Sequence, residues 1–94
     1  MRPTCAAVVL IDDARVRATR FDFAVGAQTG WHRHGHDYVI TAITECQMQI
    51  ELPDGAVQSV LVPAGAAYRR DAGVEHNVIN AGTAPMQFVE VELK

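Results

Sequence analysis

The whole chain consists of short runs of alternating or β-branched residues, separated by turn residues. This pattern limits the folds that the chain can adopt. No stretch of about 12 residues or more has sustained helical spacing, whereas apolar runs recur at intervals of about 8 to 12 residues. This spacing is typical of an all-β domain. We expect eight strands, over residues 6–11, 16–25, 38–44, 47–52, 57–62, 66–70, 76–79 and 87–93.

The clearest alternation lies in the strand expected at 47–52, where Met48, Ile50 and Leu52 share one face and the intervening residues are polar. Pro53-Asp54-Gly55 follows directly and predicts a hairpin with the next strand. Eight short strands in a chain this small fit a closed or two-sheet antiparallel barrel, which leaves few strand edges exposed. The last strand also alternates, with Val89, Val91 and Leu93 on one face and Glu90, Glu92 and Lys94 on the other.

With 94 residues the chain has room for one domain, and its net charge of -3 provides no positive field for nucleic acid. Nucleic-acid binding is therefore not expected. The apolar run 5–11 is too short to cross a bilayer and ends at Asp12 and Asp13, with no small-residue cleavage pattern after it. We expect a cytoplasmic protein without a membrane segment. Cys5 and Cys46 are too few for a disulfide scaffold, and we interpret both as reduced core residues.

Histidines form the most unusual cluster in the sequence. Three of the four lie in the run Trp31-His32-Arg33-His34-Gly35-His36, and the fourth, His76, lies on a later apolar segment. On an extended strand a His-x-His pair places both imidazoles on the same face, because side chains alternate with period 2. Imidazole suits Zn, Cu, Fe and Ni, so a third imidazole from a neighbouring strand would complete a metal site. The competing interpretation of a His-x-His pair alone is a solvated pair on an exposed strand.

The two histidine segments resemble the two sequence motifs of the cupin superfamily. The first motif spaces a glycine, a His-x-His pair, a carboxylate and a second glycine, and the matching positions are Gly26, His32, His34, Tyr38 and Glu45. The second motif spaces glycine, proline, glycine, histidine and asparagine, and the matching positions are Gly65, Asp71, Gly73, His76 and Asn80. The chain departs from the motifs at three positions: Tyr38 replaces the carboxylate, Glu45 the closing glycine and Asp71 the proline.

The resemblance implies a single cupin domain over residues 1–94, folded as a double-stranded β-helix or jelly-roll barrel. It implies one divalent transition metal per chain (Fe, Ni, Zn, Mn or Cu), held by His32, His34 and His76. It also implies a homodimer, for which the strand at 6–11 is the natural contact. The two motif segments are similar as well to those of small bacterial cupins named for β-alanine degradation.

Tyr38 stands where the family has its carboxylate ligand, which leaves three neutral imidazoles to balance a divalent cation. That imbalance favours a small anionic molecule, such as a carboxylate, as the partner of the metal. Tyr38 can approach a metal only as a phenolate, against a reference pKa of about 10, so it is either a ligand or a hydrogen-bond donor in the pocket. His36 shares strand parity with His32 and His34 and is a further candidate ligand or acid-base group. A bend at Gly35 would instead turn His36 to solvent.

Two functions fit these residues. The first is a metal-dependent enzyme, of the oxygenase type found among three-histidine cupins, that acts on a small carboxylate with Tyr38 or His36 moving a proton. The second is a non-catalytic module that binds a small anion or a metal. No serine, cysteine or lysine nucleophile with a neighbouring base is recognisable, so the histidines are central to either function. Arg69 and Arg70 must face opposite sides of their strand, so one of them can reach an anionic ligand.

Overall fold

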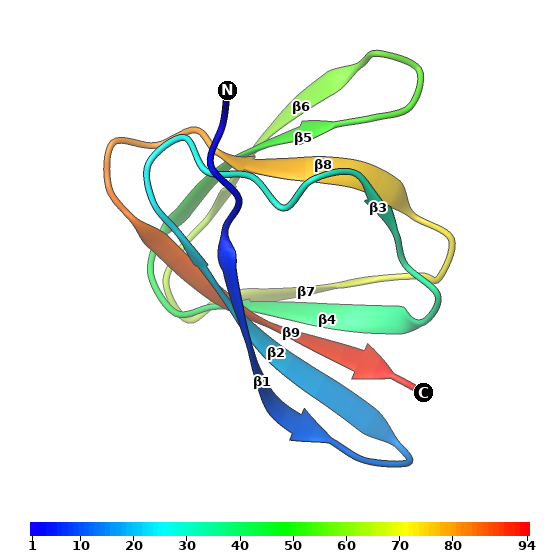
Figure 1. The fold of residues 1–94 in the computed structure, drawn as a ribbon. Coiled ribbons are helices and arrows are strands. Elements are labelled where there is room, and N and C mark those ends of the chain that lie inside the picture. Colours follow the sequence, from blue (N-terminus) through cyan, green and yellow to red (C-terminus); the bar gives the residue numbers. More distant parts are fainter.

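The computed structural model describes residues 1–94 and consists of strands joined by turns, with no helix (Figure 1). The strands in chain order are β1 (Ala6–Asp12), β2 (Val16–Phe23), β3 (His32–Arg33), β4 (Asp37–Ala42), β5 (Cys46–Glu51), β6 (Val57–Val62), β7 (Ala67–Arg70), β8 (Glu75–Asn80) and β9 (Met86–Leu93). Each of the eight predicted strands is present. The additional strand, β3, was not predicted because its two residues are too few to show alternation. No helix capable of spanning a membrane occurs in the chain.

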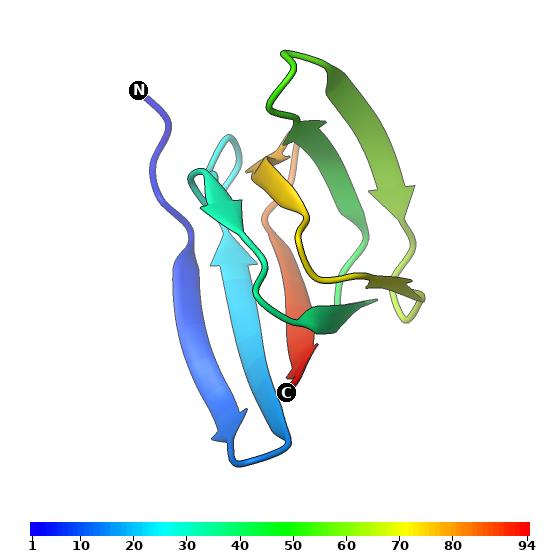
Figure 2. The same cartoon turned by 90° about the vertical axis from the view of Figure 1, so that its right-hand side faces the viewer.

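The strands form two antiparallel sheets that pack face to face as a barrel (Figures 1 and 2). One sheet has the order β1-β2-β9-β4-β7 and the other the order β3-β8-β5-β6. Strand β9 lies between β2 and β4, so the last strand of the chain occupies the centre of the larger sheet. The prediction of an all-β, single-domain jelly-roll barrel is confirmed.

The core lies between the two sheets and is formed by the inward-facing residues of each strand. Met48 and Ile50 are buried, as the alternation in β5 predicts, with exposed fractions of 1% and 5%. Phe88 of β9 packs against Phe21 and Phe23 of β2, with ring centroids 5.4 Å apart in both pairs. Aromatic pairs of this kind contribute about 0.5–1.5 kcal/mol each beyond their buried area. Aromatic packing therefore anchors the centre of the larger sheet to the core.

Strand β9 turns its glutamates, not its valines, toward the interior. Met86, Phe88 and Glu90 are buried, whereas Val89 and Val91 lie on the outer face and are partly exposed. The alternation predicted for this strand is confirmed, but polarity alone does not identify the inner face. A carboxyl group is tolerated inside only when a polar partner reaches it. The partner of Glu90 is the imidazole of His34, which belongs to the histidine cluster.

Candidate metal centre

Two segments that are far apart in the sequence bring His32, His34 and His76 together. His32 lies on β3 and His76 on β8, and the register of these strands places the two residues opposite each other. The backbone of His34 is held by two hydrogen bonds of 2.8 Å, because its N–H donates to Val74 and its carbonyl accepts from the N–H of Gly73. Gly73 has a φ of 97°, a left-handed conformation that favours glycine. This turn therefore fixes the distance between the two segments.

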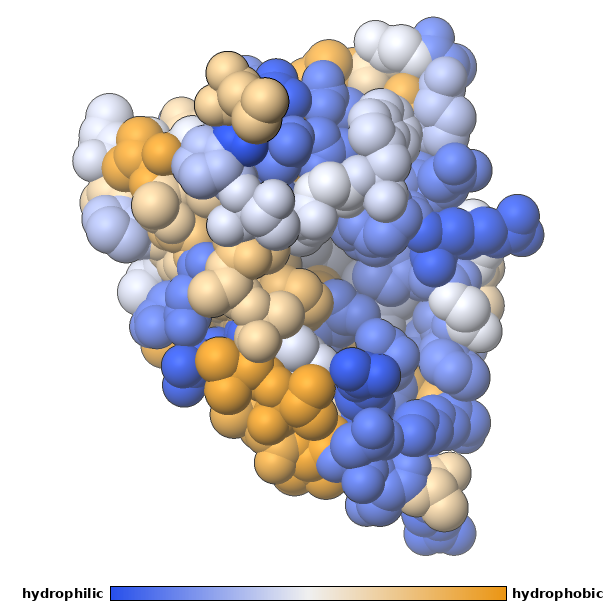
Figure 3. Space-filling view, viewed as in Figure 1, coloured by the Kyte–Doolittle hydropathy of each residue, from blue (hydrophilic) through white to orange (hydrophobic).

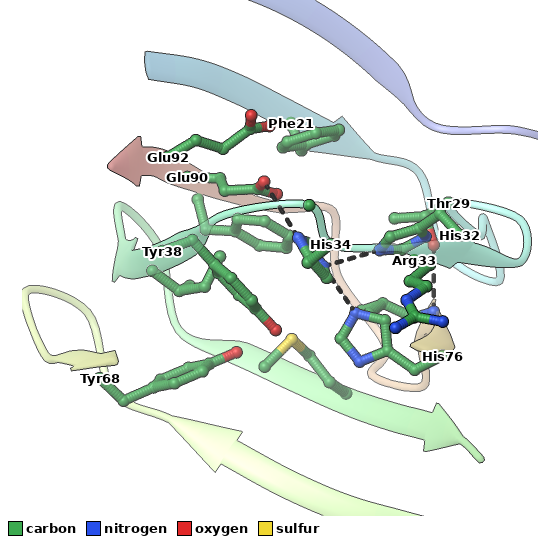
Figure 4. A pocket seen from close by; sticks show the side chains of 15 residues that line it. Phe21, Thr29, His32, Arg33, His34, Tyr38, Tyr68, His76, Glu90 and Glu92 are labelled. Atoms are coloured by element: carbon green, nitrogen blue, oxygen red, sulfur yellow. Dashed lines mark hydrogen bonds and ion pairs between the residues drawn. The ribbon is translucent and has the colours of Figure 1, made fainter. Parts of the chain in front are cut away.

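The three imidazoles direct their Nε2 atoms at a common point (Figure 4). The Nε2 atoms of His32 and His34 are 3.0 Å apart, and those of His34 and His76 are 3.1 Å apart. Two nitrogen ligands bound at about 2.1 Å to one ion, and about 90° apart around it, are themselves about 3.0 Å apart. The observed separations therefore match two ligands of a single transition-metal ion.

The outer nitrogen of His32 indicates which tautomer that ring adopts. Its Nδ1 lies 2.8 Å from the carbonyl oxygen of Gly30, which can only accept a hydrogen bond, so Nδ1 carries the proton. The Nδ1 atom of His34 lies 3.5 Å from a carboxylate oxygen of Glu90, which favours the same tautomer. With both Nδ1 atoms protonated, the two Nε2 lone pairs face each other at 3.0 Å. These lone pairs repel each other unless a cation lies between them, and a metal ion provides that charge.

Burial keeps two of these imidazoles in the neutral form that binds metals. His34 and His76 are each 8% exposed. Loss of hydration, with a smaller contribution from repulsion by the neighbouring imidazoles, lowers the pKa of both residues to about 4. Metal ions compete with protons for the ring nitrogen, so a lowered pKa leaves the lone pairs available over most of the pH range. The sequence prediction that these residues form a metal site is consistent with this geometry.

Glu90 is a residue of the site that sequence reasoning missed. Its side chain is 9% exposed and lies behind His34, on the side away from the other two imidazoles (Figure 4). Burial, together with a hydrogen bond to Glu92, raises the pKa of its carboxyl group to about 7. The only signal in the sequence was a pair of acidic residues at alternate positions of a strand that is otherwise apolar.

Tyr38 lies flat against His34, at the position where the motif has its carboxylate. The two rings are stacked with centroids 3.8 Å apart and an interplanar angle of 16°, and Tyr38 is 2% exposed. Burial raises the pKa of its phenol above the ordinary value, which disfavours the phenolate that metal ligation requires. The geometry thus favours the hydrogen-bond donor over the ligand among the two predicted alternatives.

His36 lies outside the site. The chain bends at Gly35 and His36, which are not part of a strand, and the side chain of His36 is exposed and does not line the cavity. His36 does not share the inward face of His32 and His34, because the strand that would have imposed the alternation ends at Arg33. His36 therefore faces solvent, as in the second of its two predicted alternatives, and is not positioned to act as a ligand or an acid-base group in this cavity.

The three histidines line a cavity of about 380 Å³ between the two sheets. This volume suits a small metabolite. One wall is aromatic and aliphatic, and β9 contributes two carboxyl groups. The other prominent lining residues are Phe21, Arg33, Tyr38, Ile40, Met48, Tyr68, Val78, Phe88, Glu90 and Glu92.

Comparison with known proteins places this barrel and its histidines in one family. The family described as "Cupin domain" matches residues 19–92 of the chain. The beta-alanine degradation protein BauB of Pseudomonas aeruginosa is 50% identical over 93 residues, which make up 99% of this chain and 97% of that protein.

Solved structures agree with this assignment. A cupin domain from Bordetella pertussis Tohama I superposes with a TM-score of 0.95 and 41% identity, and the alignment covers 100% of this chain and 97% of that one. A cupin superfamily protein from Desulfitobacterium hafniense DCB-2 superposes with a TM-score of 0.75 over 99% of this chain and 80% of that one, but its 15% identity shows the fold alone. The chain belongs to the cupin family.

Proposed function

We propose that this cupin is a metal-dependent enzyme of the oxygenase type that acts on a small carboxylate metabolite. The observation that carries the proposal is the convergence of three Nε2 atoms, from His32, His34 and His76, at the wall of a cavity of about 380 Å³. These histidines would hold one divalent transition metal ion. When bound, the ion supplies Lewis-acid or redox chemistry.

The remaining residues of the cavity have roles that follow from their positions. The histidines contribute no negative charge, so the centre attracts an anionic group such as a carboxylate. Glu90 holds the ring of His34 from behind, and the ring of Tyr38 packs against its face. Phe21 and Phe88 line the same cavity and exclude water from part of it. The Tyr38 hydroxyl is the proposed site of proton transfer or hydrogen bonding to the substrate.

The similarity to BauB supports a small carboxylate as the substrate. The name of that protein refers to β-alanine degradation, and β-alanine is itself a short carboxylate. At 50% identity over nearly the whole chain, a related substrate class is a reasonable extension to this protein.

The metal content of the purified protein tests the site directly. Wild-type protein is expected to contain close to one transition-metal ion per chain by mass spectrometry, and His34→Ala is expected to lose most of it. His36→Ala is the matched control, because His36 is exposed and outside the cavity. Equal metal content in the wild type and in His34→Ala would contradict the proposed site. Oxygen consumption by Fe(II)-loaded protein, screened against short carboxylates, then tests the activity.

The second candidate is a non-catalytic module that binds a small anion at the metal. The exposure of His36 favours it, since no imidazole beyond the three proposed ligands lines the cavity. In this case metal-loaded protein binds short carboxylates but consumes neither oxygen nor the carboxylate. Calorimetry and product analysis on the same samples separate the two functions.

A further inference from the structure

Two tyrosines from neighbouring strands share the cavity with the histidines. Tyr38 lies on β4 and Tyr68 on β7, and the register of these antiparallel strands pairs Ile40 with Tyr68. Tyr38 and Tyr68 are therefore diagonal neighbours on the same inner face, within reach of each other's side chains. Both line the cavity, and Figure 4 shows their hydroxyl groups directed toward the same part of it.

Neither hydroxyl group forms a hydrogen bond within the protein. Tyr38 as a whole is 2% exposed. Every side-chain polar atom that is fully buried in this structure has a hydrogen-bond partner, and the Tyr38 oxygen has none, so that atom is not fully buried. The Tyr38 oxygen is therefore open to the cavity and not sealed in the core. A buried phenol whose O–H points into a cavity is available to donate a hydrogen bond to an oxygen atom of a bound molecule.

Charged groups of both signs flank the two tyrosines. Arg69 donates to Asp37 at 2.8 Å on the outer face, whereas Arg70 lies opposite Tyr38 in the strand register and forms no ion pair. The guanidinium carbon of Arg70 is 5.8 Å from the centre of the Tyr68 ring. The cavity carboxyl groups, Glu90 and Glu92, come from β9, the other neighbour of β4, and the register of β9 with β4 places Glu92 opposite Tyr38. Arg70 is exposed and does not line the cavity, so the two unpartnered hydroxyl groups, and not a net positive charge, provide the contact for an oxygen atom at this end.

We propose that Tyr38 and Tyr68 form a second binding subsite, which holds the end of the substrate that does not contact the histidine centre. The ligand class is a short bifunctional acid with a carboxylate at the histidines and a second carboxylate or carbonyl oxygen at the two hydroxyl groups. The inference rests on the proposed function for the first of these contacts. It adds the distal contact, which distinguishes a bifunctional acid from a simple fatty acid of the same length.

Calorimetric titration of Zn²⁺-loaded protein tests the subsite without turnover. The probes are matched pairs of equal chain length: malonate with propionate, succinate with butyrate, and glutarate with valerate. For the diacid whose length fits, wild-type protein is expected to bind at least about tenfold more tightly than it binds the matching monoacid. In Tyr68→Phe this ratio is expected to fall to within about threefold, while monoacid affinity and zinc content stay unchanged.

Tyr38→Phe is the second variant and keeps the aromatic ring stacked on His34. A diacid can also bind more tightly than the matching monoacid by chelating the metal with both carboxylates. Such chelation does not depend on either tyrosine hydroxyl group. A diacid preference that both phenylalanine variants retain therefore overturns the subsite. Equal binding of diacids and monoacids at every length by zinc-loaded wild type also overturns it and leaves the metal site standing. Protein that neither retains zinc nor binds any of the acids overturns the proposed function together with the subsite.

Discussion

Glu90 is the residue whose position departs most from what its side chain ordinarily prefers. It is 7% exposed, in a strand whose other buried residues are Met86 and Phe88, and one of its oxygens lies 3.5 Å from Nδ1 of His34. A carboxyl group behind a ligating imidazole fixes the tautomer and the orientation of the ring and makes its other nitrogen a stronger ligand. The cupin motif has a carboxylate at the position of Tyr38; here a carboxyl group from β9 lies behind His34, one of the three proposed ligands.

Replacing Glu90 with glutamine tests this role with little change in shape. Glu90→Gln is expected to weaken metal affinity about 10- to 100-fold, the usual cost of removing such a partner. Competition with a chromophoric chelator measures the dissociation constant. Glu45→Gln makes the same chemical change at an exposed residue outside the cavity and is expected to leave affinity unchanged. Equal affinities for the two variants would show that Glu90 does not support His34.

Strand β8 connects the candidate metal centre to the scaffold of the barrel. It carries His76 near one end and Asn80 at the other, and Asn80 is 2% exposed. The Asn80 amide donates to the carbonyls of Ala24 and Ala84 at 3.2 and 2.9 Å, and its oxygen accepts from the N–H of Gly82 at 3.0 Å. This one side chain thus joins two loops to the end of the strand, which explains the asparagine of the second motif.

Removal of the Asn80 amide is expected to lower the free energy of unfolding by about 2–3 kcal/mol, because buried backbone groups lose their partners. Urea denaturation of Asn80→Ala, followed by circular dichroism, measures this change. Gln49→Ala on the adjacent strand β5 is the control, since Gln49 is exposed, and its effect is expected within about 0.5 kcal/mol. Similar stabilities of the two variants would mean that the loops do not depend on Asn80.

At the edge of the whole molecule, β1 exposes an apolar surface that the monomer does not cover. All seven of its residues are exposed, and Val8, Val9, Leu10 and Ile11 have exposed fractions of 40%, 48%, 49% and 52%. Figure 3 shows a strongly hydrophobic patch low on the molecule, where Figure 1 places β1. One edge of β1 also lacks a neighbouring strand. We propose that a second copy pairs with this edge, because two copies of one edge related by a two-fold axis are self-complementary.

A charge placed in this surface is expected to separate the two copies. Val9→Lys is expected to be a monomer under conditions in which wild-type protein is a dimer, because dimerisation would bury an unpaired ammonium group. Size-exclusion chromatography with light scattering measures the molar mass. Val57→Lys introduces the same charge at a valine of β6 that is 55% exposed, and it is expected to remain dimeric. A monomeric wild type at micromolar concentration, or a dimeric Val9→Lys, would contradict pairing through β1.

Local patterns in the sequence predicted the strands and the three histidines of the site. Apolar alternation, as in Met48 and Ile50, and turns such as Pro53-Asp54-Gly55 depend only on neighbouring residues, so they can be read directly from the chain. The His-x-His pair is local in the same sense. The third imidazole, His76, could be assigned only because its segment resembles the second cupin motif.

Tertiary structure decided which side chains face the cavity. The face of β9 that carries Glu90 points inward because His34, from a distant segment, supplies a polar partner there. His36 points outward because the strand ends at Arg33, and Tyr68 reaches the cavity because β7 pairs with β4. Periodicity gives two faces for each strand but does not say which of them is covered. That choice depends on the residues across the barrel, which only the folded chain brings together.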